Sequence, residues 1–554
     1  MTSNVMAGSG SVDGSAIPET VWMAFRRPIR CTDATVRKWE RFSPSDCILL
    51  ENAFMENISE NIDVHFGRYV ANAGERWMQA YYWKEARWPI VRGTWFWRDP
   101  VDGSVCPFGE ADAATLEEAF QDIRLGLEEG PIDCELVDTD VVSGTVQFVS
   151  ELVATPGKVS LDLPSTVWKI THALYRTTQG RVERLETFRG YPGVAWVPTG
   201  EEQLASRVSH LVLCVHGIGE ALYNRQNDEF LGSVRFRGNI DIVRENLNEA
   251  ALKLGDLSLG RIEVLPVEWS ECIHSNFLDR RMESVTLPNL KSVRDFANLA
   301  LTDVFLYTQK DIQTTVSNFA KVRIEKLLEK FHRKNPPVFL SFVGHSLGSV
   351  VLYDLFIHDP AFVTPCALFF MGSPLAMFLT IRNIPLSLPL FLNCRLFNIF
   401  HPFDAIAYRL EPLIDLRMQE TEPDLVHHRG GHRVHVALRK TVSDFRSVIA
   451  SFGEWMAGVG VPDPRPEISV GPAPPPAVPP QPVLPEHVRA VKNANYNERI
   501  DWSLQESAAE SVSEWVAAVG SHFTYWKHED VAAFIVNRLV HIGKIRNQGL
   551  AWGL

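Results

Sequence analysis

Short apolar runs separated by helical patterns dominate the second half of the chain. From about residue 207 these runs are SHLVLCVHG, RIEVLPVEW, NPPVFLSFVGHS, TPCALFFMGS, CRLFNIFHPFD and GHRVHVAL. Stretches with helical spacing lie between them, the longest from Val293 to Lys334. Continuous apolar strands that alternate with helices predict an α/β fold with a mostly parallel sheet covered on both faces. We therefore expect functional side chains at the carboxyl ends of the strands.

The first part of the chain has a different pattern. Residues 1–17 are small and polar, which predicts a disordered lead. Residues 18–110 hold seven of the fifteen tryptophans, and the segment WPIVRGTWFWRD predicts a strand with alternating faces. This density indicates a compact module built on aromatic packing, with an aromatic ligand cage as the less favoured interpretation. Residues 111–205 show a helical pattern (ATLEEAFQDIRLGLEE) and then strand patterns (SGTVQFVSELV, STVWKITHALYRT), which predict a connecting α+β region.

A proline-rich segment interrupts the second predicted domain, which spans residues 206–554. Residues 461–486 carry the sequence VPDPRPEISVGPAPPPAVPPQPVLPE, which predicts a linker or an extended surface loop. After it come RIDWSLQES, a helix-like stretch and SHFTYWKHEDVAAFIVNRL. Because folded patterns return, we expect an insertion rather than a tail, and a ligand for an SH3-type domain is the less favoured alternative.

Charge and cysteine content narrow the class of protein. The chain has 54 Lys and Arg against 67 Asp and Glu, so the net charge is 54 − 67 = −13. This balance argues against a general nucleic-acid binder, although an anionic substrate stays compatible because a site is local. The eight cysteines form no CxxC pair, so we expect reduced thiols in a cytosolic protein rather than a zinc framework or a disulfide scaffold. The first twenty residues lack the basic and apolar regions of a secretory signal.

The longest uncharged stretch runs from Pro360 to Ile381. Its length alone matches a membrane span. Prolines and the Gly372-Ser373 pair divide it into a short apolar run, a turn and a second run. The prediction is therefore a buried strand, a turn and a helix, with membrane insertion as the alternative.

The sharpest chemical signal is GHSLG at residues 344–348, which fits the pattern G-x-S-x-G. An apolar strand precedes it, and the apolar helical stretch SVVLYDLFI follows it. This context predicts a nucleophile elbow, a tight strand-to-helix turn that needs small neighbours and exposes the Ser346 hydroxyl above the sheet. The alternative is a serine that only caps the helix.

A serine needs a base to accept its proton, and α/β-hydrolases order their triad as Ser, acid, His. Asp404 is the candidate acid because it follows the strand pattern LFNIFHPF, although a turn-forming aspartate is the alternative. The residues alone leave several histidines open as the base: His427, His428, His432, His435, His522, His528 and His541. Among them His522 is favoured, because it follows a helical stretch and a glycine in VAAVGSHFTYW.

An oxyanion hole needs two backbone N–H donors near the developing oxyanion. Leu347, the residue after the nucleophile, is expected to supply one of them. The loop His216-Gly217-Ile218-Gly219 follows a strand directly, so Gly217 and Ile218 are candidates for the other. The alternative for this loop is a plain strand-ending turn.

Taken together, these motifs resemble one known family. LVLCVHGIGE, RIEVLPVEWSECIH, SFVGHSLGSVVLYDLF, FFMGSPLAMFLTIR, NIFHPFDAIAYRLEPL, RIDWSLQES and SHFTYWKHEDVAAFIV are similar to segments of the intracellular phospholipases A1 with a DDHD domain, which prefer phosphatidic acid. The resemblance covers about four-fifths of the chain and places the DDHD region at about residues 360–545. The aromatic segment ending in RGTWFWRD resembles that family's WWE-like region.

The resemblance implies a serine lipase with the triad Ser346, Asp404 and His522. The acids and the histidine that give the domain its name fall on Asp404, Asp501, His522 and Asp530. Asp501 and Asp530 are expected to support the site, and no cofactor is expected. A divalent cation held by these residues is the less favoured alternative. We find no SAM-like module in the sequence, which leaves membrane targeting by such parts in doubt.

The resulting hypothesis is hydrolysis of the sn-1 acyl ester of a glycerophospholipid through an acyl-enzyme. The resemblance implies phosphatidic acid as the substrate. Cations near the predicted strand ends are candidates to contact the headgroup, chiefly Arg382 and Arg409, and also Arg395, Arg429 and Arg433. The stretch ALFFMGSPLAMFLTI is a candidate acyl groove, although core packing explains it more simply. Alternatives are a neutral tri- or diacylglycerol lipase, and a phosphoinositide-binding trafficking protein without turnover. We expect a cytoplasmic protein, peripherally associated with organelle membranes, that acts on phospholipid at a membrane surface.

Overall fold

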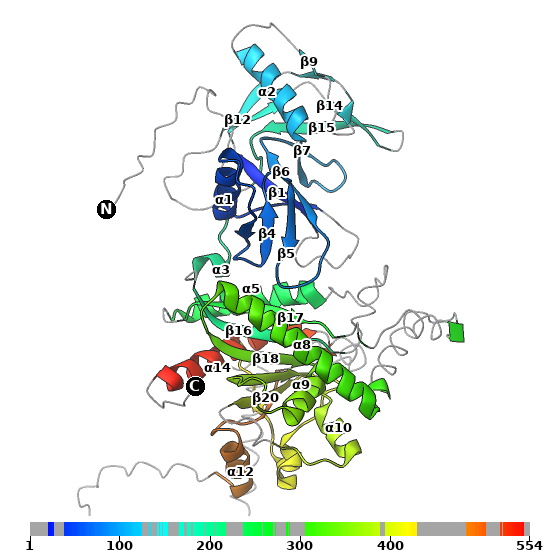
Figure 1. Cartoon of the computed structure of the whole chain (residues 1–554), viewed down its shortest axis with the longest axis vertical. Coiled ribbons are helices and arrows are strands. Elements are labelled where there is room, and N and C mark those ends of the chain that lie inside the picture. Colours follow the sequence, from blue (N-terminus) through cyan, green and yellow to red (C-terminus); the bar gives the residue numbers. More distant parts are fainter. Residues whose placement is uncertain are drawn as a thin grey trace, which may run out of the picture. The chain divides into compact units, whose positions relative to one another are not determined.

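The structure is a computed structural model of the whole chain. It describes residues 20–26, 38–124, 132–134, 141–142, 144–146, 148–152, 166–170, 174–178, 181–193, 196–204, 207–217, 236–256, 259–269, 272, 284–285, 287, 305–387, 394–428, 484–505, 521–522 and 524–547. The chain forms two compact units, Met1–Thr199 and Gly200–Leu554 (Figure 1).

The second unit is built on a seven-stranded sheet in the order β17-β16-β18-β19-β20-β22-β21. Every pair of neighbouring strands is parallel. The strands are β16 (Val208–Val215), β17 (Arg261–Val267), β18 (Phe339–His345), β19 (Ala367–Met371), β20 (Arg395–Phe400), β21 (Asp424–Leu425) and β22 (Asp501–Ser503). The predicted parallel sheet is thus confirmed, and the apolar runs chosen from the sequence form β16 to β20.

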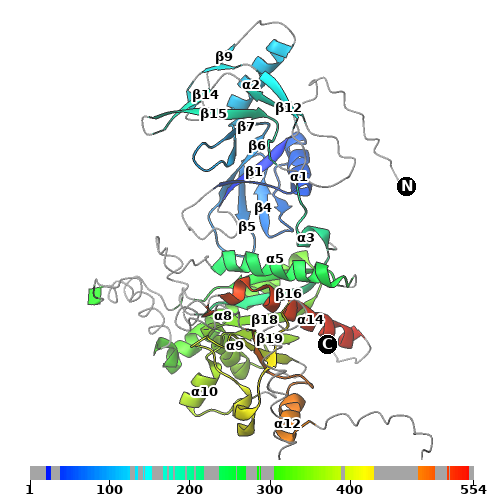
Figure 2. The same cartoon turned by 180° about the vertical axis from the view of Figure 1, so that it is seen from behind.

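Helices cover both faces of this sheet (Figures 1 and 2). On one face α5 packs against α14, and on the other α8 packs against α9. The helices of the unit are α3 (Gly200–Gln203), α5 (Phe236–Leu254), α8 (Lys310–Lys334), α9 (Leu347–His358), α10 (Leu375–Arg382), α12 (Glu486–Ala494) and α14 (Glu529–Asn547). Short 3₁₀ turns η3 (Glu411–Leu413), η4 (Leu416–Glu420) and η6 (Tyr525–Lys527) complete it.

The central strands are mainly apolar because both faces of the sheet are covered. All seven residues of β17 and all five of β19 are buried. One core cluster joins β16, β18 and β19 to α5 and α14, with Leu247, Val343 and Phe369 among its members. Burial of these apolar side chains stabilises the sheet, and the sheet determines where the carboxyl ends of its strands lie.

The uncharged stretch from Pro360 to Ile381 forms β19, a turn and most of α10, which confirms the predicted strand, turn and helix. In the described parts of the chain, no helix is both long and apolar enough to cross a membrane. Part of the predicted long helix, 293–304, lies outside the described residues, as do the predicted strand GHRVHVAL, the lead 1–17 and proline-rich residues 461–483.

The first unit contains antiparallel sheets. A six-stranded sheet has the order β2-β1-β6-β5-β4-β3, and a second sheet contains β10, β14, β15, β13, β12, β7 and β8. The elements are β1 (Val21–Arg26), β2 (Lys38–Arg41), α1 (Pro44–Met55), β3 (Ile62–Val64), β4 (Tyr69–Asn72), β5 (Trp77–Ala80), β6 (Trp88–Gly93), β7 (Trp95–Arg98), β8 (Val105–Pro107), α2 (Glu110–Arg124), β9 (Ile132–Cys134), β10 (Val141–Val142), β11 (Gly144–Val146), β12 (Phe148–Leu152), β13 (Thr166–Ile170), β14 (Leu174–Thr178) and β15 (Arg181–Arg189).

The segment WPIVRGTWFWRD forms two strands where the sequence predicted one. Its first half, β6, pairs with β1 and β5, and its second half, β7, pairs with β8 and β15. The chain leaves one sheet at Gly93 and enters the other at Trp95, which periodicity alone does not reveal. Tryptophans such as Trp22 and Trp95 are fully buried, in keeping with aromatic packing. The WWE-like character and the predicted domain borders stay predictions.

Candidate active site

Ser346 lies at a sharp turn between β18 and α9, where its backbone has φ 52° and ψ −128°. A residue other than glycine rarely adopts this conformation, which costs about 1–3 kcal/mol. Small neighbours make the turn feasible, because a Cβ on Gly348 would overlap the carbonyl oxygens of Val215, at the end of β16, and of His216, directly after it. The start of α9 therefore packs directly against the end of β16.

Hydrogen bonds on both sides hold the turn in place. The Ser346 N–H donates to the Met371 carbonyl at the end of β19, at 3.0 Å. The Ser349 hydroxyl lies 2.5 Å from the Ser346 carbonyl and 2.6 Å from the Ser373 hydroxyl. These contacts tie the elbow to α9 and to the turn after β19, so the surrounding structure offsets the backbone strain.

Asp404 and His522 form a buried pair, although 118 positions separate them. The Nδ1–H of His522 donates to the two carboxylate oxygens of Asp404 at 3.0 and 2.9 Å. Asp404 is 6% exposed and His522 is 4% exposed. Burial raises the pKa of Asp404, but the hydrogen bonds from His522 and Tyr525 outweigh it and hold this pKa below its usual value. Asp404 is therefore ionised at neutral pH.

Contacts at the carboxyl ends of β18 and β19 bring Ser346 near this pair. A Cβ on Gly372, directly after the Met371 that binds the Ser346 N–H, would lie 2.8 Å from Asp404 Oδ2 and 3.1 Å from His522 Nδ1. The ring of His345, next to Ser346, lies 4.8 Å from the ring of His522. Ser346 Oγ is buried and has no hydrogen-bond partner among the described residues. Hydrogen bonds between nucleophile and base often form fully only once substrate is bound.

The loop after β16 touches the serine from the opposite side. A Cβ on Gly217 would lie 3.1 Å from Ser346 Oγ and would overlap Ser346 Cβ. His216 anchors this loop: its Nε2 accepts the Trp269 backbone N–H at 3.1 Å, and its carbonyl accepts the Trp269 indole N–H at 2.8 Å. The two rings stack 4.9 Å apart. Ile218, the other residue predicted in this loop, lies outside the described residues.

Three residues of this site were not assigned any role from the sequence. Tyr525 donates its hydroxyl to Asp404 Oδ2 at 2.7 Å, Trp269 anchors the loop after β16, and His345 contacts the main chain of His522. The available signals were weak. Trp269 is an aromatic residue just after a strand, and Tyr525 lies three residues beyond the candidate base.

Asp501 and Asp530 have separate partners. Asp501, at the start of β22, accepts hydrogen bonds from the Asn398 amide and from the backbone N–H groups of Leu410 and Glu411, and it pairs with Arg409. Burial and the nearby Glu411 carboxylate raise its pKa. Asp530, on α14, accepts from His428 Nδ1 at 2.8 Å. Asp501 thus anchors the chain that follows Asp404, and the supporting role expected for Asp501 and Asp530 stays a prediction.

No group of three or more His, Cys, Asp or Glu side chains is arranged to hold a metal ion in the part of the chain that the structure describes. The DDHD residues are distributed over three contacts: the Asp404–His522 pair, the donors around Asp501 and the Asp530–His428 pair.

The arginines predicted to contact a headgroup bind internal carboxylates. Arg382 donates to both oxygens of the buried Asp354 at 2.9 and 3.0 Å. Arg409 pairs with Asp501 at 3.2 Å and with Glu411 at 3.6 Å. Arg429 and Arg433 lie outside the described residues, and the Arg395 guanidinium lies 5.5 Å from the Tyr496 ring centre. Any headgroup contact by Arg382 or Arg409 would compete with these ion pairs.

The remaining candidate bases lie elsewhere. His428 pairs with Asp530, and the His528 ring lies 3.8 Å from the same carboxylate. His541 is exposed on α14. His432 and His435 lie outside the described residues. Among the described histidines beyond Asp404, it is His522 that contacts this acid.

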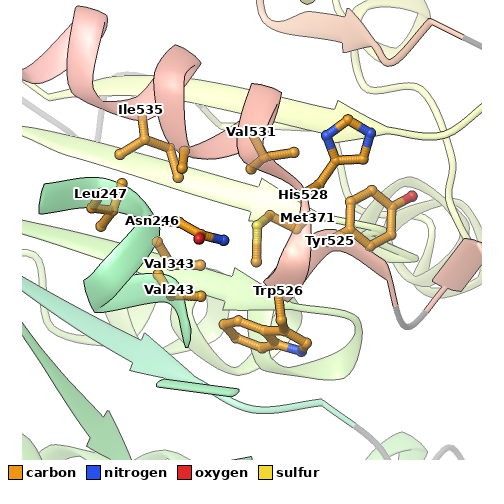
Figure 3. A pocket seen from close by; sticks show the side chains of 11 residues that line it. Val243, Asn246, Leu247, Val343, Met371, Tyr525, Trp526, His528, Val531 and Ile535 are labelled. Atoms are coloured by element: carbon orange, nitrogen blue, oxygen red, sulfur yellow. The ribbon is translucent and has the colours of Figure 1, made fainter. Parts of the chain in front are cut away.

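A small cavity lies next to the site, between β18, β19, α5 and α14 (Figure 3). Its volume is about 10 Å³, enough for about one water molecule. Its walls are mainly apolar, with Val343, Met371, Trp526 and Ile535 among them. The predicted acyl groove is mostly core, because all of β19 is buried, and this cavity is far too small for an acyl chain.

Comparison with known proteins adds an independent line of evidence to the geometry. A family model described as "DDHD domain" matches residues 363–459 and 481–540. Human triacylglycerol hydrolase DDHD2 is 24% identical over 90% of this chain and 90% of its own length. Intracellular phospholipase A1 of Caenorhabditis elegans is 26% identical over 67% of this chain and 49% of its own length. Mouse SEC23-interacting protein is 27% identical over 57% of this chain and 31% of its own length.

Among solved structures, one match is to ClbQ from the colibactin NRPS/PKS pathway. The matched region covers 61% of this chain and 99% of the ClbQ chain, at 14% sequence identity. The TM-score is 0.19, so this likeness carries no argument. The domain match and the relatives agree with the motifs quoted from the sequence. The chain carries a match to the DDHD domain and is similar to proteins of the DDHD-domain phospholipase A1 family.

Proposed function

We propose that this protein is a serine lipid hydrolase that cleaves the sn-1 acyl ester of glycerophospholipids, with phosphatidic acid as its preferred substrate. The observation that carries the proposal is the convergence of the strained Ser346 elbow with the buried His522–Asp404 pair at the end of β19. Relatives named as phospholipases and as a triacylglycerol hydrolase support lipid esters as the substrate class.

In the proposed mechanism, His522 is the general base. Its Nδ1–H is committed to Asp404, so Nε2 carries the lone pair that accepts the Ser346 proton. Ser346 Oγ then attacks the ester carbonyl carbon, and a tetrahedral oxyanion forms. The protonated His522 returns the proton to the leaving lysophospholipid oxygen as the bond to the acyl carbon breaks. The ionised Asp404 stabilises the imidazolium between these two steps.

The second half of the cycle uses the same groups. His522 takes a proton from water, the hydroxide attacks the acyl-Ser346 carbonyl, and fatty acid leaves as Ser346 regains its proton. In both halves the oxyanion is placed against the backbone N–H of Leu347 and an N–H from the loop at Gly217. Leu347 is the first residue of α9, where helix N–H groups lack partners within the helix. Each such donor is worth about 10²–10³ in rate.

A second candidate substrate is neutral glycerolipid. The relative named triacylglycerol hydrolase covers 90% of this chain. Both arginines favoured as headgroup contacts are paired with internal carboxylates, which also weakens the case for an anionic headgroup. The chemistry at Ser346 is the same for both substrates, so only the contacts beyond the reacting ester differ.

A non-catalytic role in trafficking is the third candidate, because one relative is named SEC23-interacting protein. In this role the protein would bind phosphoinositide without turnover. The strained elbow argues against it, because a binding protein gains nothing from a buried serine held beside an Asp–His pair. For either enzyme, peripheral attachment to organelle membranes would bring the site to its lipid.

The test combines product analysis with active-site labelling. Purified wild type and Ser346→Ala are given mixed-acyl phosphatidic acid and triolein in separate assays, and the released fatty acids are identified. We expect release of the sn-1 acyl chain from phosphatidic acid, fluorophosphonate labelling at Ser346, and loss of both in Ser346→Ala by several orders of magnitude. Ser45→Ala, at an exposed serine of the first unit, is the control and should match wild type.

Each outcome selects one candidate. Faster turnover of triolein assigns the neutral lipase, and sn-2 release corrects the position. A protein that binds lipid but is neither labelled nor active would support the trafficking role. Full activity in Ser346→Ala would refute the proposed nucleophile.

A further inference from the structure

His345 makes a contact that the proposed mechanism does not use. It is the last residue of β18 and directly precedes Ser346. Its Nε2 lies 2.8 Å from the backbone carbonyl oxygen of His522, which is 177 positions further along the chain. A carbonyl oxygen only accepts, so Nε2 of His345 must carry the hydrogen. One bond thus joins the neighbour of the nucleophile to the main chain of the base.

The surroundings of His345 keep this donor in place. The side chain is buried at 5% exposure, and its ring lies 4.8 Å from the ring of His522, 5.1 Å from that of Trp526 and 5.9 Å from that of Tyr525. Burial, and then the nearby His522, lower the pKa of His345 to about 3. The ring is therefore neutral across the working range of pH, and its hydrogen stays on Nε2.

Two contacts from distant parts of the chain bear on the position of His522. Its ring is bonded through Nδ1 to Asp404, and its main-chain carbonyl accepts a hydrogen bond from His345. The His522 main chain belongs to no strand of the sheet, so sheet pairing does not set its height above the strand ends. The bond from His345 fixes the carbonyl of residue 522 and, with it, the point from which the ring extends toward Ser346.

We propose that His345 is a positioning residue, which sets the distance between Ser346 Oγ and His522 Nε2 by holding the His522 carbonyl. The inference rests on the proposed function, because it requires Ser346 as the nucleophile and His522 as the base. It assigns His345 no contact with substrate. A base displaced by about 1 Å can lose about 10²-fold in rate. On this proposal, a histidine is needed at the second position of the GHSLG motif because its Nε2–H donates to the His522 carbonyl across the site.

A packing role alone makes a different prediction. If the ring only fills space beside Tyr525 and Trp526, then a side chain of similar size without a donor should serve equally well. If the hydrogen bond matters, the position of the donor must matter as well. Glutamine can place an amide N–H where Nε2 lies, asparagine places its amide one atom short, and methionine has similar length without a donor.

The experiment compares His345→Gln, His345→Asn and His345→Met with wild type. For each purified protein, kcat and KM are measured on a soluble short-chain ester, together with the rate of fluorophosphonate labelling and the Tm. We expect kcat and the labelling rate to fall by about 10- to 100-fold in His345→Met and His345→Asn, with KM within about twofold of wild type. His345→Gln should recover most of the loss.

Two results would overturn the proposal. One is a folded His345→Met with wild-type kcat, and the other is an equal loss in His345→Gln and His345→Met at equal Tm. If His345→Met does not fold, the comparison of His345→Gln with His345→Asn decides in the same way. A wild-type protein that is neither labelled at Ser346 nor active on esters would overturn the proposed function, and this inference with it. Failure of the inference alone would appear in an active, labelled enzyme.

Discussion

The Tyr525 hydroxyl donates to Asp404 Oδ2 at 2.7 Å and at the same time accepts the His401 backbone N–H at 2.8 Å. Tyr525 is fully buried, and its pKa is raised well above the usual value by burial and by the Asp404 charge, so it remains a donor. This phenol ties the acid of the site to the chain that leaves β20. It also stabilises the ionised form of Asp404.

The first prediction concerns pH. Tyr525→Phe removes one donor from the Asp404 carboxylate and leaves the His401 N–H without its acceptor. A carboxylate with fewer donors holds its proton more tightly, and the site needs Asp404 ionised. The acidic limb of kcat/KM should therefore move to higher pH, and stability should fall by about 1–3 kcal/mol. The measurements are a pH–rate profile and urea unfolding.

Tyr496→Phe is the matched control, because Tyr496 is partly exposed and its ring contact with Arg395 survives the change. It should leave both the pH profile and the stability as in wild type. If Tyr525→Phe shifts the acidic limb downward or leaves it in place, Tyr525 does not support the charge on Asp404.

The contrast between local and distant signals explains how much the sequence could predict. The strands were found because each is a short run buried on both faces, and Ser346 and Gly217 were found because tight turns need small residues at fixed neighbouring positions. Asp404 was suggested by its place after a strand. These signals are all local, and each is readable within about ten residues.

The rest of the site depends on contacts between distant parts of the chain. Trp269 anchors His216 across 53 positions, Tyr525 binds Asp404 across 121, and His345 contacts His522 across 177. No periodicity encodes such contacts. For the same reason the residues alone left seven histidines open as the base. The local context of His522 favoured it among them, and family resemblance strengthened that choice. The contact between Arg382 and Asp354 was hidden for the same reason. The charge of Arg382 was therefore expected to be available for a headgroup.

The second prediction tests the close approach of Gly217 to the serine. In Gly217→Ala the new Cβ would overlap Ser346 Cβ and lie 2.7 Å from the His345 carbonyl oxygen. The loop after β16 must then move away from the oxyanion, so we expect a loss of at least about 10²-fold in kcat. Steady-state kinetics on a soluble ester measure it. Gly543→Ala, where the nearest atom beyond the helix backbone is 3.8 Å away, is the control and should be fully active. Wild-type kcat in Gly217→Ala would exclude this loop from the site.

The third prediction separates structural support from metal binding. Asp501 is fully buried and meets donors from Asn398, Leu410, Glu411 and Arg409. Asp501→Ala removes the acceptor of the Leu410 and Glu411 N–H groups and one partner of the Arg409 charge, and it should destabilise the fold by about 3–5 kcal/mol. Asp530→Ala should cost less, because its partner His428 is partly exposed to water. Denaturant unfolding measures both changes.

The same assignment predicts that chelation has no effect on ester hydrolysis by wild type. The enzyme is dialysed against EDTA and assayed with and without added Ca²⁺ or Mg²⁺, and the rate should stay constant. A chelator-sensitive rate restored by one of these cations would show that a metal takes part after all. In that case the loss in Asp501→Ala should also respond to the cation concentration.

The last prediction concerns the strain at the elbow. Ser346 and Asn383 both have positive φ, at 52° and 53°, but their ψ values are −128° and 44°. Asn383 is in the left-handed region that asparagine tolerates at a helix end, whereas Ser346 is in a region that favours glycine. Relief of about 1–3 kcal/mol of strain should exceed the glycine entropy cost of about 0.5–1 kcal/mol. Inactive Ser346→Gly should therefore be more stable than inactive Ser346→Ala by roughly 1 kcal/mol in urea unfolding. Asn383→Gly should raise the free energy of unfolding by only a few tenths of a kcal/mol. An equal gain at positions 346 and 383 would mean that the elbow holds no unusual backbone strain.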